Sequence, residues 1–357
     1  MCQPDGGGLL STGQDFTSDN ASGASPVVID ALARANSRTA LAYGDDPYTA
    51  DLQAKLADLF EHEVTVLPMF TGTAANALSL SCMAPPFGAV FCHSEAHIFT
   101  SECGAPEFFT GGAKLIPLEG AEGRIDPHSF ERALAELGKG VAHHFQPAGL
   151  SLTQATESGT LYELSRITEL AGIAHREGLT VHMDGARLAN AVAATKVSLA
   201  EMTWQSGIDV LSFGLTKNGG ICAEAVIFFN PALASEARFR QKRAGQVASK
   251  MRFVSAQILA LIEDGLWLDL ARHANAMARR LTEGLSAEQI TLPAQINEVF
   301  LKLTRDTADR LRGEGFMFHP WGVEPKHGEC IYRFVTSFAT EARDVDALIR
   351  ALERARR

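Results

Sequence analysis

Short apolar runs alternate with helix-patterned segments through most of this chain. The runs 179–183 and 208–211 are mostly apolar, and the segment 161–177 ahead of them spaces its apolar residues as a helix does. Two parallel strands need a crossover connection of a dozen or more residues, which is usually a helix. The alternation therefore predicts an α/β fold, with a mainly parallel central sheet flanked by helices. Ligands of such sheets bind beyond the ends of the strands.

The remaining expected elements continue this alternation and end in a smaller domain. We expect residues 1–15 to form a disordered tail, 16–270 a large domain, and 271–357 a small C-terminal α+β domain. With 357 residues, of which 46% are hydrophobic, the chain can bury the core that two such domains require. Strands and helices are expected at 27–36, 49–60, 63–69, 73–81, 89–92, 114–118, 127–137, 225–229, 239–273, 298–303, 316–319, 331–335 and 341–355.

Composition excludes several classes of protein. The net charge of −10 and the isoelectric point near 5.6 argue against a nucleic-acid surface, which needs clustered Lys and Arg. Six cysteines without a Cys-x-x-Cys pair suggest neither a zinc framework nor a disulfide scaffold, so reduced thiols and no metal are expected. No uninterrupted apolar stretch is long enough to cross a bilayer, which predicts a cytoplasmic protein without a membrane partner.

Two strand-end motifs carry most of the chemistry. Lys217 lies on a turn followed by two glycines just past one apolar run, and Asp184 ends another such run before a glycine. A desolvated lysine can bind an aldehyde as a Schiff base, and a carboxylate can keep a pyridine nitrogen protonated. Together they predict a pyridoxal 5'-phosphate (PLP) site. Lys217 without Asp184 would be read as a solvated loop lysine.

A third motif offers a place for the phosphate group. Gly72 and Thr73 follow a strand-like run and open a helix, so backbone amides and a hydroxyl could hold an anion at the positive helix end. The alternative is an ordinary strand-to-helix turn with Thr73 as its N-cap. Thr216, next to Lys217, is a second possible phosphate contact.

Other polar residues follow the expected strands. His97 could stack on a pyridine ring or relay a proton, although a pair of surface histidines, His93 and His97, is the plainer alternative. Asp184 and Arg187 could share one face of an opening helix, although an exposed ion pair is the usual outcome of this spacing.

Two longer motifs resemble those of the L-threonine aldolases, in particular a low-specificity branch that also cleaves phenylserine-type substrates. They are His182-Met-Asp184-Gly-Ala-Arg187-Leu-Ala-Asn190 and Ser212-Phe-Gly-Leu-Thr-Lys217-Asn-Gly. The resemblance runs from about Phe16 to the C-terminus. Shorter matching segments lie at 17–20, 42–46, 72–76, 102–108 and 249–252.

The resemblance implies a fold-type-I PLP-dependent enzyme whose active sites form at the interface of a homodimer or homotetramer. The implied substrates are small β-hydroxy-α-amino acids such as L-threonine, L-allo-threonine and phenylserine, which are split into glycine and an aldehyde. Lys217 is implied as the Schiff-base lysine, Asp184 as the partner of the ring nitrogen, and His97 as the stacking residue. Further implied contacts are Gly72 and Thr73 to the phosphate, Arg187 to the cofactor and the substrate carboxylate, Ser18 and Arg333 to that carboxylate, and Tyr43 and Arg252 from a neighbouring subunit.

Arg333 also makes physical sense without the resemblance. A planar guanidinium on a strand can grip a carboxylate with two hydrogen bonds. The alternative is a surface arginine on an edge strand.

One segment departs from the family pattern. Many threonine aldolases have a histidine near the substrate hydroxyl, where this chain has Glu157 in Gln154-Ala-Thr-Glu157-Ser-Gly159. Either Glu157 is an acidic partner of that hydroxyl, or the role falls on His97 or a water molecule. The rival functions on the same scaffold are an aminotransferase, a β-eliminating lyase, a racemase and a non-catalytic PLP-fold binding protein.

Overall fold

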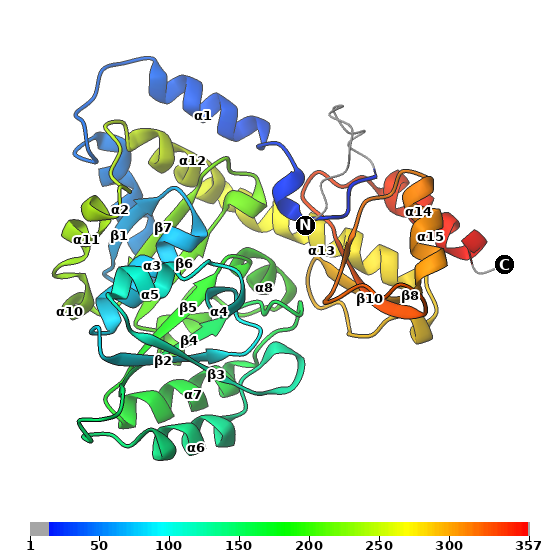
Figure 1. Cartoon of the computed structure of the whole chain (residues 1–357). Helices are drawn as coiled ribbons and strands as arrows, with labels where there is room; N and C mark the ends of the chain where they lie inside the picture. Colours follow the sequence, from blue (N-terminus) through cyan, green and yellow to red (C-terminus); the bar gives the residue numbers. More distant parts are fainter. Residues whose placement is uncertain (1–13, 356–357) are drawn as a thin grey trace. The chain divides into compact units, whose positions relative to one another are not determined.

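The computed structural model describes residues 14–355, which divide into two compact units (Figure 1). The larger unit, unit 2, spans Gly23–Arg272, and unit 1 combines the residues up to Ser22 with those from His273 onward. The division thus places 14–22 with the C-terminal part of the chain. Most of the expected tail, 1–13, lies outside the described residues. Its last two positions are ordered: Met317 N donates to Gln14 O at 2.9 Å, and Asp15 forms a β-bridge with Met317.

Unit 2 is built on a seven-stranded sheet within the described residues, with the order β1-β7-β6-β5-β4-β2-β3. All neighbouring pairs are parallel except those that involve β7, which runs antiparallel to both β1 and β6. The expected mainly parallel sheet is therefore confirmed. The strands are β1 (Thr65–Met69), β2 (Gly88–His93), β3 (Lys114–Leu118), β4 (Gln146–Thr153), β5 (Thr180–Gly185), β6 (Val210–Gly214) and β7 (Glu224–Phe228).

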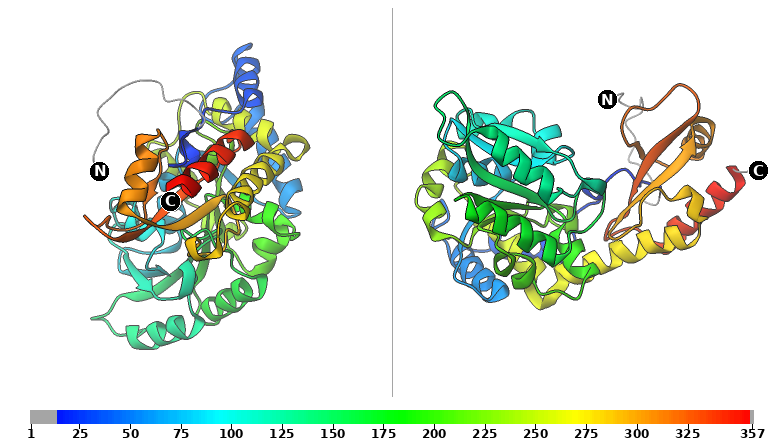
Figure 2. Two further views of the ribbon diagram at one scale, coloured as in Figure 1. Left: turned by 90° about the vertical axis from the view of Figure 1, so that its right-hand side faces the viewer. Right: turned by 90° about the horizontal axis from the view of Figure 1, so that it is seen from below.

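Helices cover the sheet (Figure 2). The central one is α3 (Gly72–Met83), which Thr71 caps through its hydroxyl and which packs on five of the strands. Its residues from Ala75 to Ser81 are all buried, as expected for a helix apolar on most faces. The other helices of this unit are α1 (Pro26–Asn36), α2 (Pro47–Phe60), α4 (His97–Thr100), α5 (Ala105–Thr110), α6 (Pro127–Leu137), α7 (Leu164–Arg176), α8 (Leu188–Ala194), α9 (Leu199–Met202), α10 (Pro231–Ala234), α11 (Ala237–Arg243) and α12 (Arg252–Ile262).

The continuous helical pattern expected over 239–273 is wrong. The chain leaves α11 before Gly245, whose φ of 72° is left-handed, and enters α12 only at Arg252. It bends again at Asp264, with φ of 50°, before α13 (Leu266–Glu283), which contains the boundary between the units. Apolar spacing continues across both breaks, so periodicity alone does not reveal them.

Unit 1 has a small antiparallel sheet of order β8-β10-β9, which confirms the expected α+β character. Tyr332 and Phe334 of its central strand are fully buried, and the sheet packs with α14 and α15. The strand expected at 316–319 is wrong: Met317 forms an isolated bridge, and only His319–Pro320 pair with β10. The elements are β8 (Glu298–Thr304), α14 (Arg305–Gly313), β9 (His319–Pro320), β10 (Glu329–Val335) and α15 (Ala342–Ala355).

Candidate active site

The sheet brings most of the predicted residues of unit 2 to one edge. β1, β2, β4, β5 and β6 all run in the same direction, since β1 and β6 are both antiparallel to β7. Their carboxyl ends therefore lie along a common edge, where α/β sheets bind ligands. The predicted residues follow these ends: Gly72 and Thr73 after β1, His97 after β2, Glu157 after β4, Asp184 and Arg187 at β5, and Thr216 and Lys217 after β6.

Asp184 lies in the middle of this edge and is 4% exposed. It is the partner of Thr153 on β4 and of Ser212 on β6. Ala186 N donates to its Oδ1 at 3.0 Å, and Asn76 Nδ2 donates to its Oδ2 at 2.8 Å. Because Asp184 is a strand residue, the expected shared helix face with Arg187 is wrong.

Asn76 links Asp184 to a second acidic group. Its Nδ2 also donates to Glu102 Oε1 at 2.8 Å, and His97 Nδ1 lies 2.8 Å from the same oxygen. The hydrogen bond to Glu102 raises the pKa of His97, which favours the charged imidazole. One buried amide thus connects two of the predicted residues, His97 and Asp184. The alternative of a surface histidine is wrong for His93, which is buried. The side chain of His97 is 46% exposed, and its Nδ1 joins this network.

Glu157 reaches the same network from β4. Its Oε1 accepts from His97 N at 2.7 Å and from Thr153 Oγ1 at 3.1 Å. Its Oε2 is buried and has no hydrogen-bond partner among residues 14–355. Burial, and then the charge of Asp184, raise the pKa of Glu157 to about 7. A carboxyl group with this pKa can exchange protons near neutral pH.

Lys217 lies in a short 3-10 helix, η4 (Thr216–Asn218), that begins just past β6. The turn is fixed from its far side, where Asn218 Nδ2 donates to Trp267 O at 2.7 Å. Gly219 closes it with φ of 103°, which a residue with a side chain rarely adopts. The lysine is therefore held on a rigid segment beside the sheet, and its charge acts on His97 and on Glu224.

A buried carboxyl group that sequence reasoning did not assign lies next to this turn. Glu224, the first residue of β7, is 6% exposed, and Thr216 N donates to its Oε1 at 3.3 Å. Burial is the main cause that raises the pKa of Glu224 to about 7.

The first turn of α3 has backbone groups of the kind that can bind a phosphate. Thr71 Oγ1 accepts from Ala74 N at 3.1 Å, so Thr71 is the N-cap and the alternative of Thr73 in that place is wrong. The N–H groups of Gly72 and Thr73 have no acceptor within the helix because they belong to its first turn. Together with the positive helix end they fit an anion. The groups predicted to hold the ring also fit PLP, since Asp184 is a buried acceptor linked to His97 through Asn76 and Glu102, and Lys217 follows the adjacent strand.

A buried polar chain lies beneath Asp184. His182, two residues earlier on β5, places Nδ1 2.9 Å from Ser151 Oγ and Nε2 3.0 Å from Ser212 Oγ. Burial lowers the pKa of His182 to about 4, so the ring is neutral near pH 7. These contacts give both ring nitrogens of the buried His182 a hydrogen-bond partner, and the neutral ring adds no charge below the site.

Two predicted residues of unit 2, Tyr43 and Arg252, do not follow the end of a strand. Tyr43 is 54% exposed, and Arg252 Nε donates to Ala35 O at 3.1 Å. Ser18 and Arg333 belong to unit 1, where Ser18 caps residues Asp19–Ala21 and Arg333 Nη1 lies 3.4 Å from Glu298 Oε1. Arg333 is on the central strand β10, so the alternative of an edge-strand arginine is wrong.

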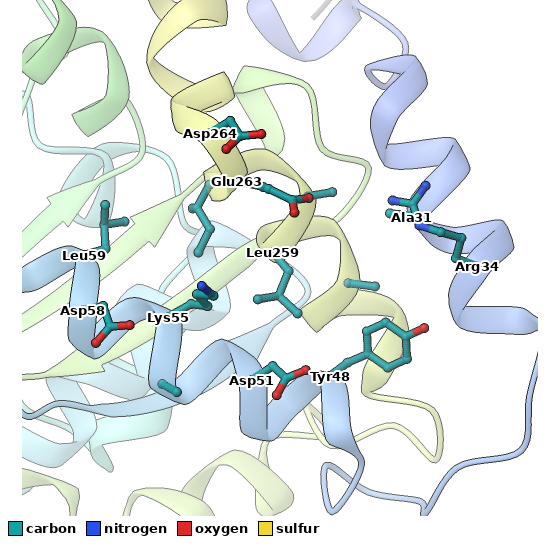
Figure 3. A pocket seen from close by; sticks show the side chains of 14 residues that line it. Ala31, Arg34, Tyr48, Asp51, Lys55, Asp58, Leu59, Leu259, Glu263 and Asp264 are labelled. Carbon is teal, nitrogen blue, oxygen red and sulfur yellow. The ribbon is translucent and has the colours of Figure 1, made fainter.

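One cavity of unit 2 is lined by residues other than the predicted ones. It has a volume of about 700 Å³ and lies among α1, α2 and α12, with Tyr48, Lys55 and Glu263 in its lining (Figure 3). None of the predicted residues of unit 2 lines it, so we do not assign it to the candidate active site.

Comparison with known proteins agrees with this geometry. The architecture is that of the fold-type-I PLP-dependent enzymes: a threonine aldolase from Leishmania major superimposes with a TM-score of 0.89 at 30% identity, over 95% of this chain and 98% of that one. The model of the beta-eliminating lyases matches residues 15–306, and the chain belongs to that family.

Two curated relatives are similar to this chain over nearly its whole length. A low specificity L-threonine aldolase from Pseudomonas sp. (strain NCIMB 10558) is 40% identical over 95% of this chain and 98% of its own. A low specificity L-threonine aldolase from Pseudomonas aeruginosa is 41% identical over 94% of this chain and 96% of its own.

Three residues that contact the predicted ones received no role from sequence: Asn76, Glu102 and Glu224. Asn76 and Glu102 fall in segments that match the family, but their contacts join positions far apart in the chain. Glu224 gave a weaker signal, a lone acid that opens an apolar strand.

Proposed function

We propose that this chain is a PLP-dependent aldehyde-lyase that cleaves the Cα–Cβ bond of β-hydroxy-α-amino acids. L-threonine, L-allo-threonine and phenylserine would yield glycine and an aldehyde. The observation that carries the proposal is the placement of Asp184 and Lys217 at the carboxyl ends of adjacent strands, with His97 linked to Asp184 through Asn76. The names of the full-length relatives support this reaction over others of the same fold.

The cofactor would be held by residues along the sheet edge. PLP, when bound, supplies an electron sink for the bond that breaks at Cα. Lys217 would bind its aldehyde covalently, Asp184 would accept a hydrogen bond from the ring nitrogen, and His97 would lie on the ring. Gly72, Thr73, Thr216, Arg187 and Arg252 would contact its polar substituents.

Substrate orientation would depend on three cationic or polar side chains at the carboxylate. Arg187 and Arg333 offer guanidinium groups that match a carboxylate with two hydrogen bonds, and Ser18 offers a hydroxyl. Holding the carboxylate fixes which bond at Cα stands out of the ring plane, and this choice selects the bond that is cleaved.

Glu157 would take the proton of the β-hydroxyl group. It accepts a hydrogen bond from the backbone of His97, and its Oε2 lacks a partner in the part of the chain that the structure describes. An unpartnered carboxylate oxygen with a pKa of about 7 is suited to receive a proton at neutral pH. His97 or a water molecule is the alternative base.

We also propose that the enzyme is a homodimer or homotetramer with shared active sites. Leu41 and Tyr43 are 69% and 54% exposed. They flank Ala42, which lines a cavity together with Lys250 and Arg252. A second copy that covers this surface would bring Tyr43 and Arg252 to its neighbour's site. Among the described residues no helix is long and apolar enough to span a bilayer. The cytoplasmic location stays a prediction.

Product analysis with L-threonine tests the proposal most simply. Purified enzyme with PLP should release equal amounts of glycine and acetaldehyde. Formation of 2-oxo-3-hydroxybutyrate without ammonia would point to an aminotransferase, 2-oxobutyrate with ammonia to a β-eliminating lyase, and inversion of threonine at Cα to a racemase. A protein that binds PLP covalently without turnover would instead be a non-catalytic binding protein. A panel of threonine, allo-threonine and phenylserine stereoisomers then defines the substrate preference.

A further inference from the structure

Glu224 lies where two turns of the candidate site meet. It is the first residue of β7, paired with Met69, the last residue of β1, and with Gly214, the last residue of β6. Because β7 is antiparallel to both strands, its first residue lies beside the two ends from which the site turns begin. One turn contains Gly72 and the other contains Lys217.

The Glu224 carboxyl group is enclosed by both turns. Thr216 N donates to its Oε1 at 3.3 Å. A Cβ atom built on Gly72 would lie 3.8 Å from its Oε2, and one built on Gly214 would lie 2.9 Å from it. The carboxyl group is therefore next to the first turn of α3, where the unpaired backbone N–H groups favour an anion.

Two charged groups act on this carboxyl group, in opposite directions. The cation Lys217 lowers the pKa of Glu224, and Asp184 raises it. Burial changes the pKa more than either charge does and raises it to about 7. Near neutral pH the group is therefore partly protonated. No ion pair between Glu224 and an Arg or Lys side chain occurs within residues 14–355.

We propose that Glu224 takes up a proton when the phosphate group of the cofactor binds at the first turn of α3. The inference rests on the proposed function. A phosphate dianion beside this turn places negative charge near a carboxyl group that forms no ion pair within residues 14–355, and like charges favour the protonated form. The proton comes from solvent, and the neutral acid keeps its contact with Thr216. Cofactor binding is then linked to pH through a residue that touches neither the ring nor the substrate.

The sign of the linkage follows from the two states. Phosphate raises the pKa of Glu224, so the bound enzyme carries more protons than the free enzyme at and above neutral pH. Cofactor affinity is then highest at acidic pH and weakens as pH rises through about 7. Each unit by which the phosphate raises this pKa weakens binding about tenfold across the titration.

The dissociation constants of PLP and of pyridoxal, which lacks the phosphate, test the linkage. Each is measured by tryptophan fluorescence for the wild type, Glu224→Gln and the exposed-acid control Glu177→Gln, from about pH 6.5 to about pH 9. Wild type and Glu177→Gln should lose affinity for PLP by about tenfold more than Glu224→Gln over this range. Pyridoxal should show no such difference between the three proteins. Equal pH dependence of PLP binding in wild type and Glu224→Gln contradicts the proposal.

Proton counting gives a readout that does not depend on the variant. Calorimetry of the wild type at about pH 8, in two buffers of different ionisation enthalpy, should show more proton uptake with PLP than with pyridoxal. Equal proton uptake with PLP and pyridoxal would assign the proton to formation of the Schiff base at Lys217, which both ligands share. That result would overturn the role of the phosphate. Failure of PLP to bind covalently at Lys217 would instead reject the proposed function. Covalent binding without extra proton uptake rejects only the role of Glu224.

Discussion

The two units of this chain place their acidic side chains differently. In unit 2, Asp184 and Glu224 are buried at one edge of the sheet, and Glu157 is half-buried there with its Oε2 enclosed. Burial raises the pKa of both glutamates to about 7. In unit 1, Asp309 and Asp346 pair with arginines at the surface, and these contacts lower the pKa of both aspartates. Buried carboxyl groups without cationic partners destabilise a fold, so their concentration at one edge marks a functional site.

The difference separates charges that serve chemistry from charges that serve solubility. Exposed ion pairs contribute little to stability because water already solvates both groups. Glu298 departs from this pattern in unit 1: its side chain is fully buried and faces Arg333. The predictions below test whether function follows the buried groups, from the largest effect to the smallest.

Loss of the covalent lysine should have the largest effect. Lys217→Ala should lower turnover of L-threonine by at least about 10³-fold and abolish the absorption band of the bound cofactor. Lys196→Ala, a change of an exposed lysine of the same unit, is the control for surface charge. A Lys217→Ala enzyme that keeps both turnover and the band would remove this residue from its role.

Loss of the Asp184 charge should have the second-largest effect on turnover. Asp184→Asn keeps the shape of the side chain but cannot hold a protonated ring nitrogen, so kcat should fall by about 10²–10³-fold. Asp346→Asn in unit 1 removes an exposed carboxylate and should leave kcat unchanged. Steady-state kinetics of the two variants compare the units directly, and an equal loss in both would contradict the distinction.

Glu157 should control the acidic side of the pH profile. Because its pKa is about 7, the carboxylate that accepts the proton is lost as pH falls through this value, and kcat should fall with it. Glu157→Gln should lower kcat by on the order of 10²-fold and remove this limb, while PLP affinity changes little. An unchanged limb in the variant would assign the base to His97 or water.

His182 should make unit 2 less stable in acid. Its pKa is lowered to about 4 in the folded chain from 6.5, so the unfolded chain binds the extra proton as pH falls between these values. The resulting loss of unfolding free energy should be on the order of 3 kcal/mol. Denaturant unfolding of wild type and His182→Gln gives the difference. The raised pKa values of Glu157 and Glu224 act in the opposite direction but equally in both proteins. A difference that does not vary with pH would contradict the neutral buried ring.

The smallest effect is expected from the surface of unit 1. Arg280 Nε lies 2.7 Å from Asp346 Oδ1, and both side chains are solvated. Arg280→Ala should change kcat by less than about twofold and leave the thermal midpoint unchanged within error. Calorimetry and kinetics check this, and a large loss of activity would show that surface charge matters more than we infer.

Sequence predicted the parts of the fold that repeat locally. Strands β1, β2, β3, β5, β6 and β7 follow from short apolar runs, and their order along the chain gives the mainly parallel sheet. β4, Gln146–Thr153, was not expected because Pro147, Ala148 and Gly149 interrupt its apolar pattern.

Sequence likewise predicted some residues of the candidate site and not others. Residues at strand ends are predictable because parallel strands finish along a common edge, which places Asp184, Glu157 and Lys217 together. Asn76 could not be assigned from sequence, since its role arises from Asp184, 108 positions away, and Glu102, 26 positions away. The position of Glu224 beside the site depends on the antiparallel strand β7 lying between β1 and β6, which no local sequence pattern predicts.

The central claim is that Lys217 binds the cofactor beside a buried carboxylate. Borohydride reduction of the PLP-loaded enzyme, followed by peptide mapping with mass spectrometry, tests this most directly. We predict one phosphopyridoxyl group per chain, on the peptide that contains Lys217, and none on that peptide when L-threonine has displaced the lysine before reduction. A label on another lysine, or a coloured enzyme with no label on Lys217, would contradict the account.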